Sequence, residues 1–208
     1  MKIVALSDTH GKHKKVLLPE GDLLIHAGDV SVEGRKSQVI DFLKWFGRQP
    51  HRHKVFVAGN HDFYFEQNAW HDIKRMIPAG VHYLCDSGVT IEGLKIWGSP
   101  ITPWFYDWAF NRQPGADIQK HWNLIPEQTD ILVTHGPVFG VLDKIAGGKS
   151  VGCPGLLEKV RAISPRLHIS GHIHEAYGRE QLEKTEFINA SVLDEHYMVK
   201  NKPVIVEI

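Results

Sequence analysis

Short apolar runs, each leading into a polar loop, recur along the chain. Five of them are KIVALSD (residues 2–8), DLLIHAGD (22–29), KVFVAGNHD (54–62), DILVTHG (130–136) and RLHISGHIH (166–174). Runs of this length that are rich in Val, Ile and Leu predict buried β-strands. Because the apolar residues are nearly continuous rather than alternating, we expect these strands in sheets that are covered on both faces.

Two segments follow a helical pattern. SQVIDFLKWFG (37–47) places Val39, Leu43 and Phe46 at helical spacing. PGLLEKVRAI (154–163) begins with a proline, which favours the start of a helix. Alternation of such helices with the apolar strands predicts an α/β layered fold.

Three further segments predict strands of a different kind. VTIEGLKIWGS (89–99) reads as two short strands joined at Glu92-Gly93, a hairpin signal, and FINAS (187–191) and PVIVEI (203–208) add strands near the end. The sheets should therefore be mixed, with two of them packed together. No internal repeat, low-complexity stretch or long linker divides the chain, so residues 1–208 are expected to form one domain.

Composition narrows the function classes. The chain has 208 residues, of which 42% are hydrophobic and 23% charged, as in globular domains with a real core. Its 24 basic and 24 acidic residues cancel, so no stable binding to nucleic acid or to a membrane surface is expected. Two cysteines are too few for a disulfide framework, Asp8 comes too early for a signal peptide, and no apolar run reaches 18 residues. These features predict a cytoplasmic protein.

Polar side chains that could bind metal ions follow all five predicted strands. They are Asp8, His10, Asp29, Asn60, His61, His135, His172 and His174. Strand ends of an open α/β sheet border one crevice, so these side chains can converge. His172 and His174 would point the same way if the chain stays extended past Ser170. Carboxylate, amide and imidazole ligands suit Mn, Fe or Zn, and their number fits two ions better than one.

The order of motifs D-x-H, G-D, G-N-H-D, H-G and G-H-x-H resembles the calcineurin-like metallophosphoesterase superfamily at every metal-ligand position. Five motifs in the right order and strand context are far more specific than any one alone. The resemblance implies an α/β fold, a four-layer α/β/β/α sandwich of two mixed sheets flanked by helices, with two divalent metal ions. It implies Asp8, His10 and His174 on one ion, Asn60, His135 and His172 on the other, and Asp29 bridging them. Mn²⁺ is the expected metal, with Fe or Zn as alternatives.

A narrower resemblance is to the metallophosphoesterase domain-containing subgroup. The segments that carry it are LSDTHG, GDLLIHAGD, GNHD, DWAFN, THGP, SGHIHEAYG and FINAS. This resemblance implies metal-dependent phosphodiesterase activity, with cyclic nucleotides among the substrates. Some members of the subgroup lack the first histidine of G-H-x-H, so the presence of His172 implies better binding of the second ion here.

The resemblance also gives His61 a catalytic role. In the implied mechanism a hydroxide that bridges the two cations attacks phosphorus, and His61 acts as the general acid toward the leaving alkoxide or binds the phosphate. In the protein-phosphatase branch the second motif reads G-D-x-x-D-R, whereas here Val32 stands in place of that aspartate and Glu33 in place of the arginine. Phosphoprotein phosphatase activity is therefore not expected, and the group that orients His61 is left open.

Aromatic residues gather between the third and fourth motifs: Trp104, Phe105, Tyr106, Trp108 and Phe110. Their rings could stack on a nucleotide base, which contributes roughly 1–3 kcal/mol, or they could pack into a satellite core. As substrate contacts we expect Trp104, Phe105 and Trp108, with Asn111 or Arg112 at the polar edge of the base.

The predicted function is hydrolysis of a small phosphodiester or nucleotide, such as a 2′,3′- or 3′,5′-cyclic nucleotide. A phosphomonoesterase or a nuclease would use the same metals, and a non-catalytic scaffold would keep the fold after losing His61 or metal ligands. The presence of His61 and of every ligand argues against the scaffold, and zero net charge argues against a nucleic-acid-binding protein. Neither the natural substrate nor the oligomeric state follows from the sequence.

Overall fold

Two β-sheets packed face to face form the centre of the protein. The computed structural model describes residues 1–208. The first sheet has the order β13-β1-β2-β3-β4. Its strands are β1 (Lys2–Leu6), β2 (Leu23–Ala27), β3 (His53–Val57), β4 (Val81–Tyr83) and β13 (Val204–Glu207). Strands β1 to β4 are parallel, and β13 pairs antiparallel with β1.

The second sheet has the order β11-β12-β10-β9-β6-β5. Its strands are β5 (Ser87–Ile91), β6 (Leu94–Ser99), β9 (Ile131–Thr134), β10 (Leu167–Ser170), β11 (Gly178–Leu182) and β12 (Thr185–Asn189). The four central strands are parallel, whereas β5 and β11 close the two edges in antiparallel pairs. Both sheets are therefore mixed, as predicted.

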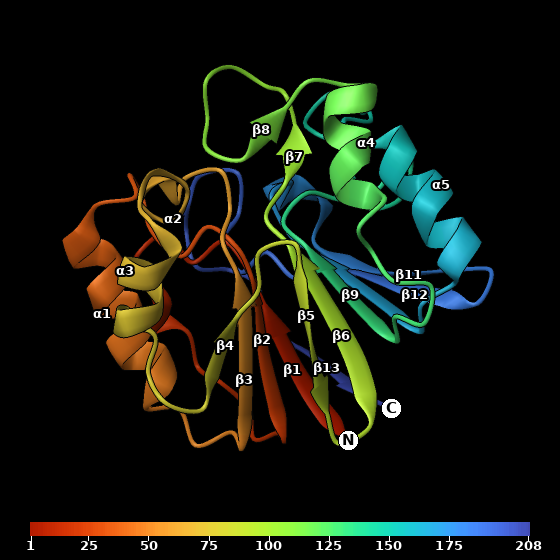
Figure 1. The fold of residues 1–208 in the computed structure, drawn as a ribbon. Helices are drawn as coiled ribbons and strands as arrows, with labels where there is room; N and C mark the ends of the chain where they lie inside the picture. Colours follow the sequence, from red (N-terminus) through yellow and green to blue (C-terminus); the bar gives the residue numbers. More distant parts are fainter.

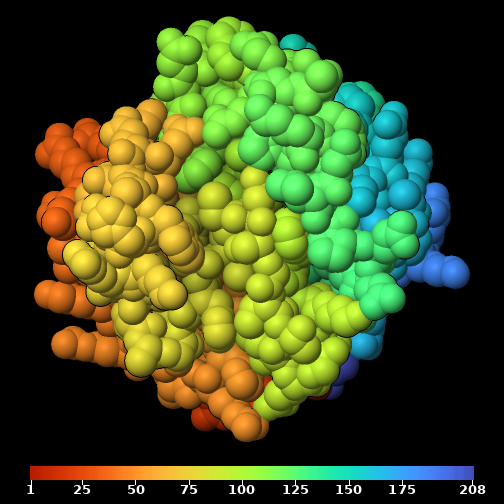
Figure 2. All heavy atoms as spheres, in the orientation of Figure 1, coloured from red at the N-terminus to blue at the C-terminus, as the bar shows by residue number.

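Helices cover the outer face of each sheet (Figure 1). The first sheet carries α1 (Lys36–Gly47), α2 (Phe63–Gln67) and α3 (Trp70–Met76), and the second carries α4 (Ala116–Trp122) and α5 (Pro154–Ile163). Figure 2 shows the residues of the β5–β6 hairpin filling the band between these two helical sides. The predicted four-layer α/β/β/α sandwich is confirmed.

Three small elements complete the fold. Two 3₁₀ turns, η1 (His13–Lys15) and η2 (His174–Ala176), lie at the strand ends, and β7 (Thr102–Pro103) pairs with β8 (Asn111–Arg112) in a short ribbon above the second sheet (Figure 1). The ribbon carries the aromatic loop, residues 104–110. It therefore presents that loop at the end of the sandwich where the parallel strands finish.

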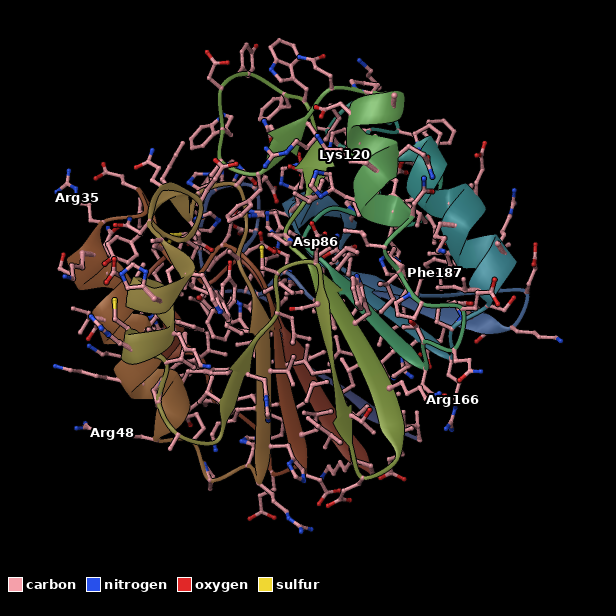
Figure 3. The ribbon with its side chains drawn as sticks, viewed as in Figure 1. Arg35, Arg48, Asp86, Lys120, Arg166 and Phe187 are labelled. Carbon is pink, nitrogen blue, oxygen red and sulfur yellow. The ribbon has the colours of Figure 1, made fainter.

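Alternate residues of each central strand pack into different layers. In β1, Ile3 and Ala5 join the core between the two sheets, whereas Val4 and Leu6 join the core beneath the helices. Figure 3 shows Phe187 of β12 beneath the helices of the second sheet, and it belongs to this helix-side core. Because both faces of the strand are buried, burial of each large aliphatic side chain contributes roughly 1.5–3 kcal/mol. Burial on both faces explains why the apolar runs do not alternate with polar residues.

The longer elements stand where the sequence predicts them. Segments 37–47 and 154–163 are α1 and α5, and segment 89–99 forms the β5–β6 hairpin, with left-handed backbone at Glu92 (φ 48°) and Gly93 (φ 85°). The sequence did not predict the short elements α2, α3, α4, β4, β7, β8 and β11. Segments this short gain their order from tertiary contacts rather than from their own periodicity.

One local prediction is wrong. The chain does not stay extended past Ser170, because β10 ends there, His172 has a left-handed backbone (φ 70°) and a 3₁₀ turn begins at His174. His172 and His174 therefore do not share the face of a strand.

None of the helices combines the length and the apolar composition needed to cross a bilayer.

Candidate metal centre

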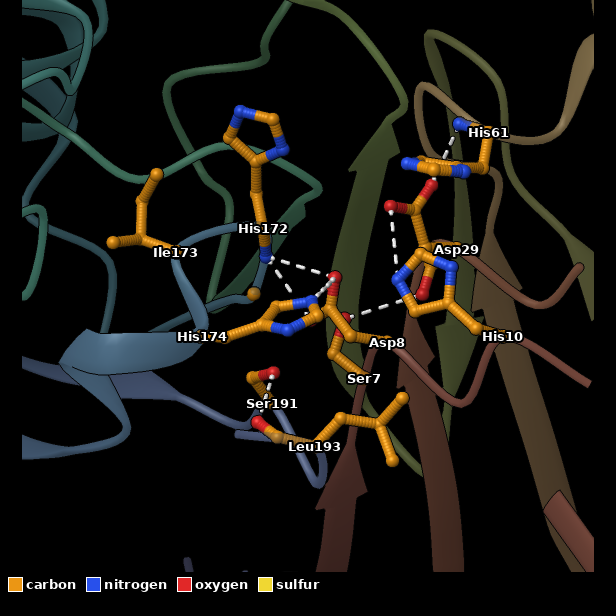
Figure 4. Close-up of polar contacts among 12 residues, drawn as sticks. Ser7, Asp8, His10, Asp29, His61, His172, Ile173, His174, Ser191 and Leu193 are labelled. Carbon is orange, nitrogen blue, oxygen red and sulfur yellow. Dashed lines mark hydrogen bonds and ion pairs between the residues drawn. The ribbon is translucent and has the colours of Figure 1, made fainter. Parts of the chain in front are cut away.

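The predicted ligands meet at the carboxyl ends of the parallel strands. Asp8, Asp29 and Asn60 follow β1, β2 and β3 of the first sheet, and His135 and His172 follow β9 and β10 of the second. Figure 4 shows Asp8 facing the segment that carries His172 and His174, and Asp29 facing His61. The site thus lies across the junction of the two sheets, and each sheet supplies part of it.

Strained backbone aims several of these side chains. Asp8 (φ 55°), His10 (φ 39°), Asp29 (φ 55°) and His172 (φ 70°) all have left-handed backbone, which non-glycine residues rarely adopt. Each such residue costs about 1–2 kcal/mol. Strain of this kind persists only where the surrounding structure enforces it, and it is concentrated at functional sites.

Two glycines leave room for the carboxylates. A Cβ atom at Gly59 would lie 2.2 Å from Oδ1 of Asp29, and one at Gly171 would lie 2.2 Å from Oδ2 of Asp8. No larger residue fits either position without moving a carboxylate. The glycines beside the motifs are therefore required by close approach.

One group of possible ligands consists of Asp8, His10 and His174, whose ligand atoms lie within 4.8 Å of one another. Nε2 of His174 is 3.6 Å from Oδ1 of Asp8. The main-chain N–H of His172 donates to both oxygens of Asp8, at 3.1 and 3.0 Å. Nδ1 of His174 donates to the carbonyl of Asp194 at 2.9 Å, so its Nε2 is the nitrogen free to bind a metal.

A second group consists of Asp29, His135 and His172, again within 4.8 Å. Nε2 of His135 is 3.3 Å from Oδ2 of Asp29 and 2.9 Å from Oδ1 of Asn60. Asp29 also forms a group with His10 and His61. It therefore borders both groups, as a bridging ligand must.

Burial sets the charge of two of the histidines. It lowers the pKa of His10 and that of His172 to about 4. Both imidazoles are consequently neutral near pH 7, which is the form that binds a metal ion.

The carboxylates pair with the other two histidines. Burial would lower the pKa of His135, but the negative charge of Asp29 outweighs burial and raises this pKa to about 9. His174 likewise has a pKa raised to about 9, because its hydrogen bond to Asp8 and the charge of that carboxylate outweigh burial. Burial would raise the pKa of Asp8 and that of Asp29, yet the facing histidines hold both below the usual range. A cation placed here would displace protons from the two histidines.

The residues fit a pair of divalent cations. His10 is 3% exposed, yet neither of its ring nitrogens has a hydrogen-bond partner. An unsatisfied buried polar group costs about 1–3 kcal/mol, and a bound cation would satisfy one of these nitrogens. Two buried carboxylates, four imidazoles and an amide oxygen also make the mixed ligand set that Mn, Fe and Zn accept.

The main chain orients His61. Its Nδ1 donates to the carbonyl oxygen of Val32 at 2.7 Å, and its backbone N–H donates to Oδ1 of Asp29 at 2.8 Å. Because a carbonyl can only accept, Nδ1 carries a proton and Nε2 is left for the substrate. The residue that replaces the aspartate of the protein phosphatases thus still orients this histidine, through its backbone.

Asp62 is a supporting residue that the sequence reasoning did not assign. It is fully buried and accepts hydrogen bonds from the N–H groups of Val30, Ser31 and Gly59 and from the Ser31 hydroxyl. Burial, and then the charge of Asp29, raise the pKa of Asp62 to about 6. Asp62 ties the loop after β2 to the loop after β3. Its position at the end of the GNHD motif was the available signal.

A cavity of about 700 Å³ opens in front of the ligands. Its lining includes His10, Asp29, Asn60, His61, His172 and His174 together with Trp104, Phe105 and Trp108. The ring of Trp108 lies 4.3 Å from that of His61, and the ring of Phe105 lies 6.4 Å from that of His172, between centroids. Of the other two rings, Phe110 is buried in the core, and Tyr106 is exposed and does not line the cavity.

Asn111 and Arg112 do not line this cavity. The side chain of Asn111 accepts from the Thr102 hydroxyl at 2.7 Å and donates to the carbonyls of Phe105 and Tyr106. Arg112 forms an ion pair with Glu66 at 3.0 Å. The expectation that these two residues touch the base is corrected, because the side chain of Asn111 holds the aromatic loop and that of Arg112 pairs with Glu66 of α2.

The structure also adds a residue to the site that no sequence signal indicates. Tyr197 lines the cavity, although it lies in the loop between β12 and β13 and far along the chain from every motif. By contrast, His26, His51 and His168, which the sequence leaves outside the motifs, are buried in the interior and do not line the cavity.

Known proteins of one family are similar to this chain over its whole length. The family model described as "Calcineurin-like phosphoesterase" matches residues 1–176. Metallophosphoesterase domain-containing protein 1 of Homo sapiens is 40% identical over 230 residues, which cover 100% of this chain and 71% of that protein. A UPF0046 protein of Caenorhabditis elegans is 35% identical over 217 residues, covering 99% of this chain and 74% of that protein.

Solved structures share the fold at low sequence identity. The phosphopantetheinyl hydrolase of Mycobacterium tuberculosis superposes with a TM-score of 0.62 at 15% identity, covering 94% of this chain and 90% of that one. A protein of Thermus thermophilus gives a TM-score of 0.61 at 13% identity, covering 90% of this chain and 88% of that one. At these identities the likeness concerns the fold alone.

Proposed function

This chain belongs to the calcineurin-like phosphoesterase family, and on that premise we propose that it is a binuclear metal-dependent phosphodiesterase for small phosphodiesters. The family makes it a metal-dependent phosphoester hydrolase. The observation that supports the finer proposal is that His61 and five of the seven potential ligands line one cavity walled by aromatic rings, while Asp8 and His135 complete the ligand groups beside it. The proposed site thus has ligands for metal ions that activate the attacking water, and a histidine that can protonate the leaving group.

In this proposal Asp8, His10 and His174 would hold one divalent cation, Asn60, His135 and His172 would hold the other, and Asp29 would be a ligand of both. When bound, such cations supply charge neutralisation at the phosphate and an activated water. Mn²⁺ is the metal we expect, with Fe or Zn as alternatives. The buried, strained backbone at Asp8 and Asp29 supports the ligand roles, because it fixes both carboxylates before any metal arrives.

The chain's own proton donor is His61. Its Nδ1 is held by the carbonyl of Val32, so Nε2 faces the cavity with a fixed orientation. In the charged imidazolium form Nε2 can donate a proton to the leaving alkoxide, whose departure is the step that a general acid assists. The rings of Trp108 and His10, at 4.3 and 4.6 Å, keep the imidazole from swinging away.

We propose nucleotides, including 2′,3′- and 3′,5′-cyclic nucleotides, as the substrate class. The cavity of about 700 Å³ is large enough for a nucleotide, and Trp104 and Phe105 expose 48% and 49% of their surface. Exposed rings at the mouth of a phosphate site provide stacking surfaces for a base.

Both cysteines are free thiols, which supports the cytoplasmic location that the sequence predicts.

The test begins with protein stripped by a chelator. Hydrolysis of bis(p-nitrophenyl) phosphate is measured without metal and after addition of Mn²⁺, Fe²⁺ or Zn²⁺. We expect turnover that requires added metal, that is lost in His61→Ala and that persists in His71→Ala, whose histidine is exposed on α3. Absence of turnover with every metal would refute the diesterase proposal. Equal turnover by His61→Ala would refute the role of His61 alone.

The substrate class needs a second measurement. Rates with 2′,3′- and 3′,5′-cyclic nucleotides are compared with rates with a phosphomonoester and with single-stranded oligonucleotides. Preference for the monoester would move the assignment to a phosphomonoesterase, and preference for the oligonucleotide would move it to a nuclease. Metal-dependent turnover of the cyclic nucleotides in excess of both is the expected result.

A further inference from the structure

Tyr197 borders the metal centre without a role in the proposal above. Its ring lines the cavity, and the ring centroid lies 5.0 Å from that of His10 and 5.0 Å from that of His174. These two histidines belong to the same group of possible ligands. Tyr197 therefore forms the cavity wall beside one of the two proposed cation sites.

The backbone of Tyr197 is strained. Its φ of 58° lies in the left-handed region, which costs an aromatic residue free energy. Burial does not explain why a tyrosine stands there, because the residue is 44% exposed. Tyr106 shares this backbone (φ 55°), so what sets Tyr197 apart is its place at the cavity beside His10 and His174.

The turn that carries Tyr197 also orients a ligand. The carboxylate of Asp194 accepts from the main-chain N–H of His196 at 3.0 Å and from that of Met198 at 2.8 Å. The carbonyl of Asp194 accepts from the N–H of Tyr197 and from Nδ1 of His174, both at 2.9 Å. One residue thus fixes the position of the tyrosine relative to the metal centre.

The hydroxyl of Tyr197 makes no hydrogen bond within the protein, and the half-exposed residue lines a cavity whose wall includes the charged side chains of Asp29 and Lys149. A phenol is a hydrogen-bond donor near neutral pH, and an anionic oxygen is its strongest acceptor. Resting on the function proposed above, we propose that Tyr197 is a substrate-contact residue whose hydroxyl donates a hydrogen bond to the phosphate group of the ester. The partly exposed ring and the rigid turn prepare this donor before the substrate binds.

The test uses two tyrosines with nearly the same backbone. Tyr106 has a φ of 55° and is 68% exposed, but it does not line the cavity, so Tyr106→Phe is the matched control for Tyr197→Phe. Each Mn²⁺-loaded protein is titrated with inorganic phosphate by calorimetry. Metal content and the unfolding temperature are measured on the same samples, and kcat/KM is measured with bis(p-nitrophenyl) phosphate.

We expect Tyr197→Phe to weaken phosphate binding and to lower kcat/KM by about tenfold each, because a hydrogen bond to a charged group is lost. Metal content and the unfolding temperature should stay at the wild-type values, and Tyr106→Phe should change none of the four quantities. Tyr197→Asn should bind phosphate equally weakly while unfolding at a higher temperature than Tyr197→Ala, because asparagine tolerates left-handed backbone.

Three results would overturn the inference. They are equal phosphate affinity in Tyr197→Phe and the wild type, no phosphate binding by the wild type, and loss of metal from Tyr197→Phe, which would make the tyrosine a structural support for His10 and His174. Phosphate binding by a wild type that hydrolyses no diester would refute the proposed function. The phosphate titration would still decide the role of Tyr197.

Discussion

Nδ1 of His61 donates a hydrogen bond of 2.7 Å to the main-chain carbonyl of Val32. Orientation through the backbone explains how a valine can stand where the protein phosphatases have an aspartate. The same loop is fixed from the other side by Asp62, which accepts from the N–H groups of Val30 and Ser31. The loop after β2 thus presents both Asp29 and the carbonyl that orients His61, the proposed general acid.

His61→Asn should lower kcat for bis(p-nitrophenyl) phosphate by roughly 10²–10⁴-fold, the usual contribution of a general acid. Bound metal should stay at the wild-type level, because His61 contacts Asp29 through its main-chain N–H, which the variant keeps. Steady-state kinetics and elemental analysis of the same samples test both statements. A variant that loses its metal would instead be evidence that His61 is a ligand.

Substitution of Asp29, the proposed bridging ligand, should weaken the binding of both metal ions. Asp29 lies in two of the three groups of possible ligands, whereas His174 lies in one. Elemental analysis should therefore find about two ions per chain in the wild type, little metal in Asp29→Ala and loss of one ion in His174→Ala. Asp41→Ala, which removes an exposed acid on α1, is the control. Equal loss from the two ligand variants would contradict the bridging role.

Removal of metal should destabilise the fold. A cation that binds only the native state stabilises it by about 2.7 kcal/mol when its concentration is a hundred times Kd. For a chain of this size that corresponds to a fall in unfolding temperature of roughly 5–10 °C after chelation. Calorimetric scans with EDTA and with excess Mn²⁺ measure the change. Identical scans would show that the carboxylates at Asp8 and Asp29 hold no cation.

Asn111→Ala and Arg112→Ala should behave differently. Loss of the contacts that Asn111 makes to Thr102 and to the aromatic loop should lower the free energy of unfolding by about 1–2 kcal/mol and raise KM. Arg112 makes a partly exposed ion pair with Glu66, which contributes at most about 1 kcal/mol. The KM of each variant is measured with bis(p-nitrophenyl) phosphate. A larger rise in KM for Arg112→Ala than for Asn111→Ala would be evidence that Arg112 contacts the substrate, as the sequence predicts.

Stability should fall in acid because of buried neutral histidines. Burial lowers the pKa of His168 to about 3, below the ordinary value of 6.5. Between these values the unfolded chain binds a proton that the native state excludes, so the contribution is complete above about pH 6.5 and is lost as the pH falls toward 3. The loss is about 1.4 kcal/mol per pH unit.

Urea unfolding in EDTA at pH 7 and pH 5 measures this effect. The difference between the two free energies of unfolding should be smaller by about 2 kcal/mol in His168→Gln than in the wild type. His71→Gln, at an exposed position on α3, should leave the difference unchanged. A His168→Gln protein with the wild-type difference would contradict the neutral, buried state of His168.

Local sequence patterns were enough to predict the five central strands, the β5–β6 hairpin, the two long helices and the polar residues that follow the central strands. Buried strands need continuous apolar runs, and parallel strands end at one edge, so Asp8, Asp29 and His135 could be assigned to a common site from local patterns alone. The order of the motifs, through the resemblance to the family, predicted a layer of helices on the outer face of each sheet.

Contacts between distant segments depend on the packed fold and could not be predicted. No local pattern encodes that the carbonyl of Val32 accepts from His61, that Asn111 bonds to the aromatic loop while Arg112 pairs with Glu66, or that Tyr197 borders His10. Main-chain carbonyls carry no sequence signature, and a left-handed tyrosine is stable only where the packed fold enforces it. Residue types at strand ends therefore specify the chemistry, and long-range packing specifies its orientation.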